Sequence, residues 1–433
     1  MDRTLIGAAA WAFAGWLAAV PAAAQPVYGV DKTAPVDDAL GLRVPSGFTA
    51  QVFADGLGRA RHLAVAPNGD VYVNLRSVDS DGRGVVALRD TDGDGAADVE
   101  ERFSDIAGTG IALRGEALYV SSNDAVFRFD RPAGTLVPTG DPVTIVSGFP
   151  EQRAHAAKPI AFDGAGHLLV EVGVPSNACQ EKIRTAGSMG RRPCDELERA
   201  GIWRFDAQAP GQDQMKDGVQ VARGLRHAVA IDWHGAADAL FFVQHGRDQL
   251  SSLWPDYFDE TDNAEMPAEE FHIVEGETVR EYGWPYTFFD PRADVRLVAP
   301  EYGGNGRENA EEGRYPHPLI AFPAHWAPND LLFHSGTGLP EGMAGGAFIA
   351  FHGSWNRAPR PQGGYQVVFA PFGEDHRPTG DWVSFADGFP NEDPLKSPRD
   401  ARYRPTGLAE GPDGALFISD SVTGRIWKVT YDG

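Results

Sequence analysis

A pattern of alternating apolar and polar positions, broken by a tight turn and then resumed, recurs along the whole chain. The clearest copies cover residues 62–73 and 406–418, with Asn68-Gly69 and Asp413-Gly414 at their turns. An Asx-Gly pair between two alternating runs is the strongest short-range signal for a β-hairpin. Each copy therefore predicts two antiparallel strands joined by a tight turn.

Weaker copies of the same pattern lie between these two. They cover residues 109–119, 159–170, 228–243 and, least regularly, 331–350. Most copies are followed by a third apolar run, as at residues 84–88 and 424–429. Repeats of three or four short strands are typical of propeller blades. The pattern predicts an all-β fold, a six-bladed β-propeller of four-stranded antiparallel blades.

Two other architectures stay open from the pattern alone. Residues 251–325 form a long stretch that could hold a seventh blade, and a two-sheet sandwich would also contain short alternating strands. Residues 48–53 precede the first copy, and we expect them to supply the outer strand of the last blade and to close the ring. A helical fold is disfavoured because no long stretch after Gln25 has the helical period.

The composition fits one large exported domain. A length of 433 residues suggests two or three domains, but no linker divides the chain, and 51 Gly with 32 Pro suit a turn-rich β protein. Residues 1–24 have the features of a secretory signal: Arg3, an apolar run and small residues at 22–24. We expect residues 25–43 to be an extension and residues 44–433 to be the propeller catalytic domain. The mature protein would be periplasmic or secreted, and an uncleaved segment would instead anchor it to a membrane.

The net charge and the cysteines limit the classes of partner that the protein can have. A net charge of −23 argues against nucleic acid, because phosphate contacts need Lys and Arg. The two cysteines, Cys179 and Cys194, are expected to pair in an oxidising compartment, and two unpaired thiols are the alternative. No Cys-x-x-Cys-His occurs, so the chain carries no covalent haem, and a separate electron acceptor is expected.

An acidic loop follows the third run of the first copy. Acids stand at loop positions 1, 3, 5, 9 and 12, with Gly95 at position 6; these acids are Asp90, Asp92, Asp94, Asp98 and Glu101. This is the oxygen-ligand spacing of a calcium loop. Because the loop follows a strand, an EF-hand pair is excluded. We expect a structural calcium ion here, and a solvated acidic turn is the alternative.

Charged residues stand directly before several copies. His155 precedes the third copy, Arg226 and His227 the fourth, and Arg402 and Arg404 the last, while residues 352–357 lie between two strands. Arg402 and Arg404 alternate, which predicts that both side chains point to one face. Together with Arg226 they would suit a ligand with several carboxylates. A single His before a strand is more often structural than catalytic.

These motifs resemble those of a known enzyme family. Gly224-Leu-Arg226-His227, Glu281-Tyr-Gly-Trp284-Pro285 and Arg402-Tyr-Arg404 are similar to segments of the soluble glucose dehydrogenase and sorbosone dehydrogenase family. Its members are exported six-bladed propellers that use pyrroloquinoline quinone (PQQ). The resemblance covers about residues 44–431, and Asn177-Ala-Cys179 is more similar to the sorbosone branch.

The resemblance implies roles for particular residues. His155 would be the general base that takes the proton of the sugar hydroxyl as hydride passes to the quinone, and Arg226 would polarise the quinone oxygens. Arg402 and Arg404 would bind the PQQ carboxylates. The main-chain carbonyls of Gly246 and Arg247 would hold the calcium of the cofactor.

The chain also departs from the family at several positions. His227 stands where the family has Asn, and Asn356-Arg357 stand where it has a lysine that faces the quinone, with Arg357 the expected substitute. Ala154 replaces the acid expected before the base.

Three functions remain open on this basis. The favoured one is a PQQ- and calcium-dependent dehydrogenase of a sugar or sugar aldehyde, which passes electrons to a cytochrome or a quinone. A calcium-dependent lactonase-like hydrolase and a non-catalytic sugar-binding propeller are the alternatives.

Overall fold

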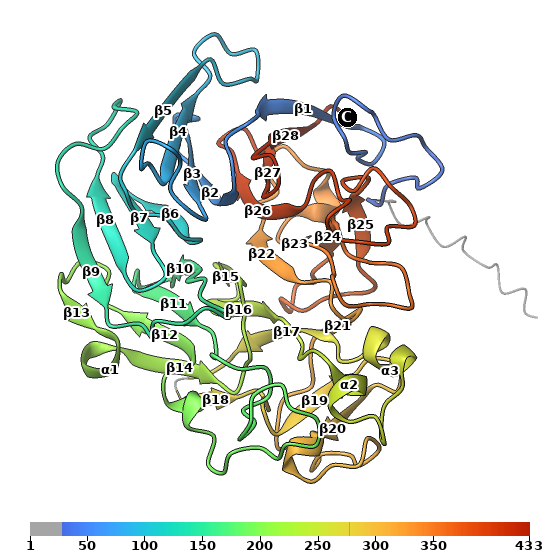
Figure 1. Ribbon diagram of the computed structural model, residues 1–433. Helices are drawn as coiled ribbons and strands as arrows, with labels where there is room; N and C mark the ends of the chain where they lie inside the picture. The colour runs from blue at the N-terminus through green and yellow to red at the C-terminus, as the bar shows by residue number, and fades with distance from the viewer. Residues whose placement is uncertain (1–27, 277) are drawn as a thin grey trace, which may run out of the picture.

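The computed structural model describes residues 28–276 and 278–433, and the predicted signal segment lies outside this range. Six small, mainly antiparallel sheets are arranged in a ring, with one further two-stranded sheet at its edge (Figure 1). The prediction of a six-bladed propeller is confirmed. The seven-bladed ring and the two-sheet sandwich are wrong.

The first three blades follow one another along the chain. Blade 1 consists of β2 (Ala60–Val65), β3 (Val71–Leu75), β4 (Val85–Arg89) and β5 (Val99–Phe103). Blade 2 consists of β6 (Ile111–Arg114), β7 (Ala117–Ser121), β8 (Val126–Asp130) and β9 (Val143–Ser147), with β13 (Gln212–Asp213) added. Blade 3 consists of β10 (Ile160–Phe162), β11 (Leu168–Val172), β12 (Gly201–Phe205) and β14 (Val219–Arg223), with β18 (Arg280–Glu281) added. The added strands pair in parallel, so blades 2 and 3 exceed the predicted four strands.

The last three blades complete the ring. Blade 4 consists of β15 (Ala230–His234), β16 (Ala239–Gln244), β17 (Glu269–Val274) and β21 (Ile320–Phe322). Blade 5 consists of β22 (Pro328–Phe333), β23 (Ala347–Phe351), β24 (Gln366–Ala370) and β25 (Val383–Ala386). Blade 6 consists of β26 (Pro405–Glu410), β27 (Leu416–Asp420), β28 (Ile426–Tyr431) and β1 (Phe48–Ala54). The pairing of β1 with β28 joins the two ends of the chain and confirms the predicted closure.

Residues 251–325 contain helices and a hairpin in place of a seventh blade. Their elements are α2 (Leu250–Leu253), α3 (Glu260–Glu265), the hairpin β19 (Thr287–Asp290) to β20 (Val295–Val298), and η2 (Pro300–Tyr302). Phe258, Phe288 and Leu297 pack into a separate apolar cluster there. The remaining short helices are α1 (Gln214–Asp217), η1 (Asp195–Glu198) and η3 (Glu341–Met343).

Buried and half-buried carboxylates join neighbouring blades. Glu171 of blade 3 accepts the main-chain N–H of Ala228 at 2.9 Å, and Asp330 of blade 5 accepts that of Leu408 at 2.8 Å. Asp232 of blade 4 likewise accepts the N–H of Phe333 at 2.8 Å, and burial raises the pKa of Asp232 to about 7. Each of these bonds satisfies a buried polar group of the next blade, which fixes the spacing between blades.

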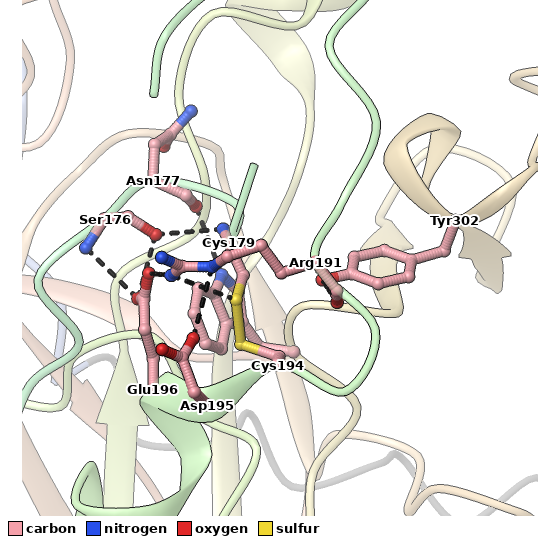
Figure 2. Close-up of a disulfide and its surroundings, with 9 residues drawn as sticks. Ser176, Asn177, Cys179, Arg191, Cys194, Asp195, Glu196 and Tyr302 are labelled. Atoms are coloured by element: carbon pink, nitrogen blue, oxygen red, sulfur yellow. Dashed lines mark hydrogen bonds and ion pairs between the residues drawn. A yellow bond between two sulfur atoms is a disulfide. The ribbon is translucent and has the colours of Figure 1, made fainter. Parts of the chain in front are cut away.

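The two cysteines form a disulfide within the long connection from β11 to β12, as expected from the sequence. Figure 2 shows the polar cluster that surrounds it. The Ser176 hydroxyl donates to Glu196 at 2.8 Å and accepts the N–H of Cys179 at 2.9 Å, while Arg191 pairs with Glu196. The disulfide therefore holds a loop that has little regular structure of its own.

Replacing both cysteines with serine should destabilise the protein. We expect the free energy of unfolding to fall by about 3 kcal/mol, because the crosslink restricts the unfolded chain. Urea unfolding of the oxidised wild type and of the C179S/C194S variant measures this loss. Equal midpoints for the two proteins would contradict it.

Candidate functional site

A cavity of about 660 Å³ opens at one end of the ring. In an antiparallel pair, the start of the first strand and the end of the second lie at the same edge of the sheet. Side chains from these two positions line the cavity in blade after blade. The first-strand positions are Arg61, Thr109, His155, Arg226, Asn329 and Arg404, and the second-strand positions include Arg76, Asn123, His245 and His352.

Five residues predicted from the sequence meet in this cavity. They are His155, Arg226, His227, Asn356 and Arg404, from blades 3, 4, 5 and 6. Arg226 is buried, and its Nη2 donates to Asp248 at 2.9 Å and to Asn177 at 3.1 Å. Arg404 donates to the carbonyls of the 352–353 peptide units at 2.9 and 2.7 Å. The ring thus brings together positions far apart in the sequence.

Arg402 does not line the cavity, so the expectation that Arg402 and Arg404 point to one site is wrong. Its side chain is exposed, lies 4.9 Å from the centre of the Tyr403 ring and donates to the carbonyl of Asp38 at 2.9 Å. The strand β26 begins only at Pro405. Arg402 and Arg404 therefore lie outside the strand, and the alternation of side chains along a strand does not apply to them.

Three more predicted residues lie beside the cavity. Arg357 donates to the carbonyl of Ala324 at 2.8 Å and does not line the cavity. Gly246 and Arg247 line a small void of about 20 Å³ behind Arg226. The Arg247 side chain pairs with Glu301 at 2.5 Å, and the carbonyls of Gly246 and Arg247 accept no hydrogen bond from any described residue.

The predicted calcium loop connects β4 to β5 at the edge of blade 1 and belongs to a different part of the molecule (Figure 1). Carboxylate oxygens of Asp90, Asp92 and Asp94 lie within 4.8 Å of one another. Asp98 instead accepts the N–H of Thr91 at 2.9 Å, and Glu101 lies in β5 opposite Ala87. The structure gathers three of the five predicted ligands.

The cavity is rich in positive charge. Six arginines line it: Arg61, Arg76, Arg153, Arg184, Arg226 and Arg404. Two acids also line the cavity, Asp248 and Glu269. Asp248 pairs with Arg226 at 2.9 Å and with Arg184 at 3.4 Å. Burial raises the pKa of Glu269 to about 8. The other four arginines make no ion pair with a described residue. In a chain with a net charge of −23, this concentration of cations indicates an anionic ligand.

His155 is oriented by a main-chain carbonyl in place of the missing acid at Ala154. Its Nδ1 lies 2.6 Å from the carbonyl oxygen of Val174. A carbonyl only accepts, so Nδ1 carries the proton and Nε2 is left with a free lone pair. Burial, Arg226 and His227 hold the pKa of His155 well below its usual value, so the ring is neutral at neutral pH. A neutral imidazole with a free Nε2 can accept a proton.

Gly173 makes room for two histidines. A Cβ atom there would lie 2.6 Å from the Cβ of His155 and 2.6 Å from the Nδ1 of His227. The two rings are 5.1 Å apart, and the Nδ1 of His227 lies 3.1 Å from a carboxylate oxygen of the buried Glu171. Glu171 was not predicted from the sequence, because it lies inside an apolar strand whose pattern is typical of the hydrophobic core.

Sequence reasoning also missed Arg61, Asp248 and Arg184. Arg61 stands directly before the first copy, so the rule that identified His155 and Arg226 would have found it. Burial, Arg76 and Arg404 lower the pKa of Arg61 to about 10. Asp248 and Arg184 lie in long connections without a repeated pattern, and no sequence signal singles them out.

Comparisons with known proteins match a family model to most of the chain and individual relatives to about half of it or less. A family model described as TrAA12-like matches residues 42–432. An uncharacterized protein of Borreliella burgdorferi is 26% identical over 212 residues, 49% of this chain and 48% of the relative. A pyrroloquinoline quinone-dependent pyranose dehydrogenase of Coprinopsis cinerea is 31% identical over 172 residues, 34% of this chain and 22% of the relative. The chain therefore matches about half or less of these relatives' lengths.

Solved structures share the fold. The calcium structure of a Trichoderma reesei family AA12 enzyme superposes with a TM-score of 0.72 at 20% identity, covering 94% of this chain and 99% of that one. The holo PQQ domain of the Coprinopsis cinerea pyranose dehydrogenase gives 0.71 at 20% identity, over 92% and 99%. The PQQ-bound aldose sugar dehydrogenase of Streptomyces coelicolor gives 0.53 at 16% identity, over 90% and 99%.

Proposed function

We propose, from the premise that the chain belongs to the TrAA12-like family, that this protein is a quinoprotein oxidoreductase of sugars that uses PQQ. The observation that carries the proposal is the cavity, where six arginines and a neutral histidine meet in an otherwise acidic protein. The names of the relatives, a PQQ-dependent pyranose dehydrogenase and an aldose sugar dehydrogenase, point to the same chemistry.

The residues of the cavity fit a planar ligand with several carboxylates. Arg61, Arg226 and Arg404 are less exposed than the other three arginines of the cavity and would hold the carboxylates and quinone oxygens of PQQ. The Nε of Arg226 and the Oδ1 of Asn356 are buried and have no hydrogen-bond partner among the described residues, so both are available to a ligand. When bound, PQQ supplies a quinone that accepts a hydride. The cavity volume lies within the usual range for cofactor sites.

His155 would act as the general base of the reaction. Its Nε2 would take the hydroxyl proton of the sugar while the carbonyl of Val174 keeps the other ring nitrogen protonated. Arg226 would polarise the acceptor, because its guanidinium is held toward the cavity by Asp248 and Asn177. The carbonyls of Gly246 and Arg247, which lack donors from described residues, would hold the calcium ion of the cofactor.

The finer parts of the proposal concern substrate and location. A sugar or sugar aldehyde would be oxidised, and a separate cytochrome or quinone would take the electrons. The disulfide suits a periplasmic or secreted protein. Among the described residues, no helix has the length and apolar character needed to cross a bilayer.

Reconstitution tests the proposed function directly. Purified protein is titrated with PQQ and calcium, and dye reduction is assayed with aldoses and sorbosone. We expect quinone absorbance on the protein and turnover of at least one sugar. Absence of both would overturn the proposal. Hydrolysis of a lactone without PQQ would favour the hydrolase, and tight sugar binding without turnover would favour a binding protein.

Calcium should stabilise the protein through the acidic loop of blade 1. With calcium at a hundred times its dissociation constant, we expect about 2.7 kcal/mol of added stability. Asp92→Asn should remove this gain, because it deletes one of the three clustered carboxylates. Urea unfolding without PQQ, with and without calcium, measures the effect.

Asp141→Asn, at an exposed position outside the loop, is the matched control and should keep the gain. The same calcium response in D92N and in the wild type would contradict a calcium site in this loop.

A further inference from the structure

The six arginines of the cavity fall into a deep set and a rim set. Arg61, Arg226 and Arg404 form the deep set, and burial lowers the pKa of each. Arg76, Arg153 and Arg184 form the rim set, whose side chains are exposed to solvent while still lining the cavity. The two sets would therefore contact different parts of a ligand bound in the cavity.

The three rim arginines line the same cavity as His155. Arg153 precedes His155 by two positions in the segment that enters blade 3. Arg184 lies on the disulfide-closed loop of the same blade and reaches Asp248 and Gln249. Arg76 follows β3 in blade 1. The three cations thus come from segments of blade 1 and blade 3.

The charges of the cavity do not balance after the cofactor is placed. The deep set matches the carboxylates of the proposed cofactor, and Asp248 pairs with Arg184 and Arg226. Arg76 and Arg153 make no ion pair with a described residue. Two cations therefore remain uncompensated in the lining of the cavity, where the low-dielectric walls of a cleft strengthen their field.

An exposed aromatic side chain lines the same cavity. Trp355, in the connection from β23 to β24 of blade 5, lines the cavity and is 56% exposed. An exposed indole offers a flat apolar face of the kind that covers the C–H face of a sugar ring. Arginines and an exposed indole in one cavity suit a sugar that carries a negative charge.

We propose that the substrate is a sugar acid, a hexuronate whose carboxylate binds the rim set while its C1 hydroxyl reaches His155. The inference rests on the proposed function and narrows its substrate class. The carboxylate would form charge-assisted hydrogen bonds with Arg153, which makes no ion pair with a described residue, and with Arg184, which shares the Asp248 carboxylate with Arg226. A neutral aldose cannot form these bonds. Trp355 would cover a face of the sugar ring.

Matched pairs of sugars test the proposal on the PQQ-loaded protein. We measure kcat/KM for D-glucuronate against D-glucose and for D-galacturonate against D-galactose, and expect the acid to be preferred in at least one pair by about tenfold at low salt. The preference should shrink as sodium chloride is added, because exposed charges are screened. Arg153→Gln and Arg184→Gln should each reduce the ratio several-fold. Arg307→Gln, at an exposed arginine outside the cavity, should keep it.

Binding provides a readout independent of turnover. Calorimetry of D-glucuronate, D-galacturonate and their neutral counterparts should give tighter binding of an acid, and R153Q should lose that difference. Equal kcat/KM for acid and neutral sugar in both pairs, or a ratio that the rim variants leave unchanged, would overturn the sugar-acid inference alone. Absence of both turnover with every sugar and quinone absorbance would overturn the proposed function, and the calorimetry would still decide whether the rim binds sugar acids.

Discussion

Replacing His155 with glutamine is expected to lower kcat/KM for sugar oxidation by about 10³-fold while PQQ stays bound. Glutamine keeps a polar group near the carbonyl of Val174 but offers no nitrogen lone pair to the substrate. The loss should therefore fall on proton removal and leave the arginine-lined part of the cavity intact. Dye-coupled kinetics measure the loss, and the quinone absorbance that remains after gel filtration measures the bound cofactor.

The pH profile gives this prediction a second readout. Burial, Arg226 and His227 lower the pKa of His155, so its base form persists as the pH falls below the usual value of 6.5. The wild-type kcat/KM should therefore stay level below pH 6.5 and decline only in more acidic solution, and H155Q should lack that decline. His167→Gln, at a partly exposed histidine paired with Asp163 outside the cavity, is the control and should behave as wild type. Loss of bound PQQ in H155Q would mean that His155 has a structural role.

The sequence predicts the fold well because each blade repeats the same local physics. Alternation and a turn define the first two strands of a blade, and these need no information from the rest of the chain. Residues 251–325 were ambiguous for the opposite reason. Their helices and hairpin are held by their own apolar cluster, around Phe258 and Phe288, and such a cluster has no periodic signature.

The site follows from the sequence only in part. In a ring of blades, the residues at the start of each blade's first strand all lie at the same end of the central axis. His155, Arg226 and Arg404 could therefore be predicted, and the same rule would have found Arg61. Arg402 fails because it lies before β26 begins, where strand alternation does not hold. Asp248 depends on contacts between blades 3, 4 and 5, which no local pattern encodes.

The carboxylate of Asp248 offsets part of the positive charge of the cavity when no ligand is bound. Its carboxylate accepts from Arg226 at 2.9 Å and from Asn356 at 2.9 Å, and Arg226, His325 and Arg184 hold its pKa below the ordinary value despite burial. An anionic ligand would compete with this carboxylate for the same guanidinium groups. Asp248 is therefore expected to stabilise the apo protein and to weaken the binding of an anionic ligand.

Asp248→Asn should accordingly change stability and cofactor affinity in opposite directions. We expect the apo protein to lose about 3 kcal/mol of unfolding free energy, because Arg226 is left buried without a counter-charge. PQQ should bind about tenfold more tightly, since the competing carboxylate is gone and the Asn177 contact still holds Arg226. Urea unfolding with and without PQQ, and PQQ titration by fluorescence quenching, measure the two effects.

Asp70→Asn is the matched control, because Asp70 is buried and pairs with Arg89 away from the cavity. It should destabilise the protein by a similar mechanism and leave the affinity for PQQ unchanged. Weaker PQQ binding in D248N would mean that Asp248 orients Arg226 for the ligand rather than competing with it. The difference between the two variants thus separates the charge of the cavity from the general cost of breaking a buried ion pair.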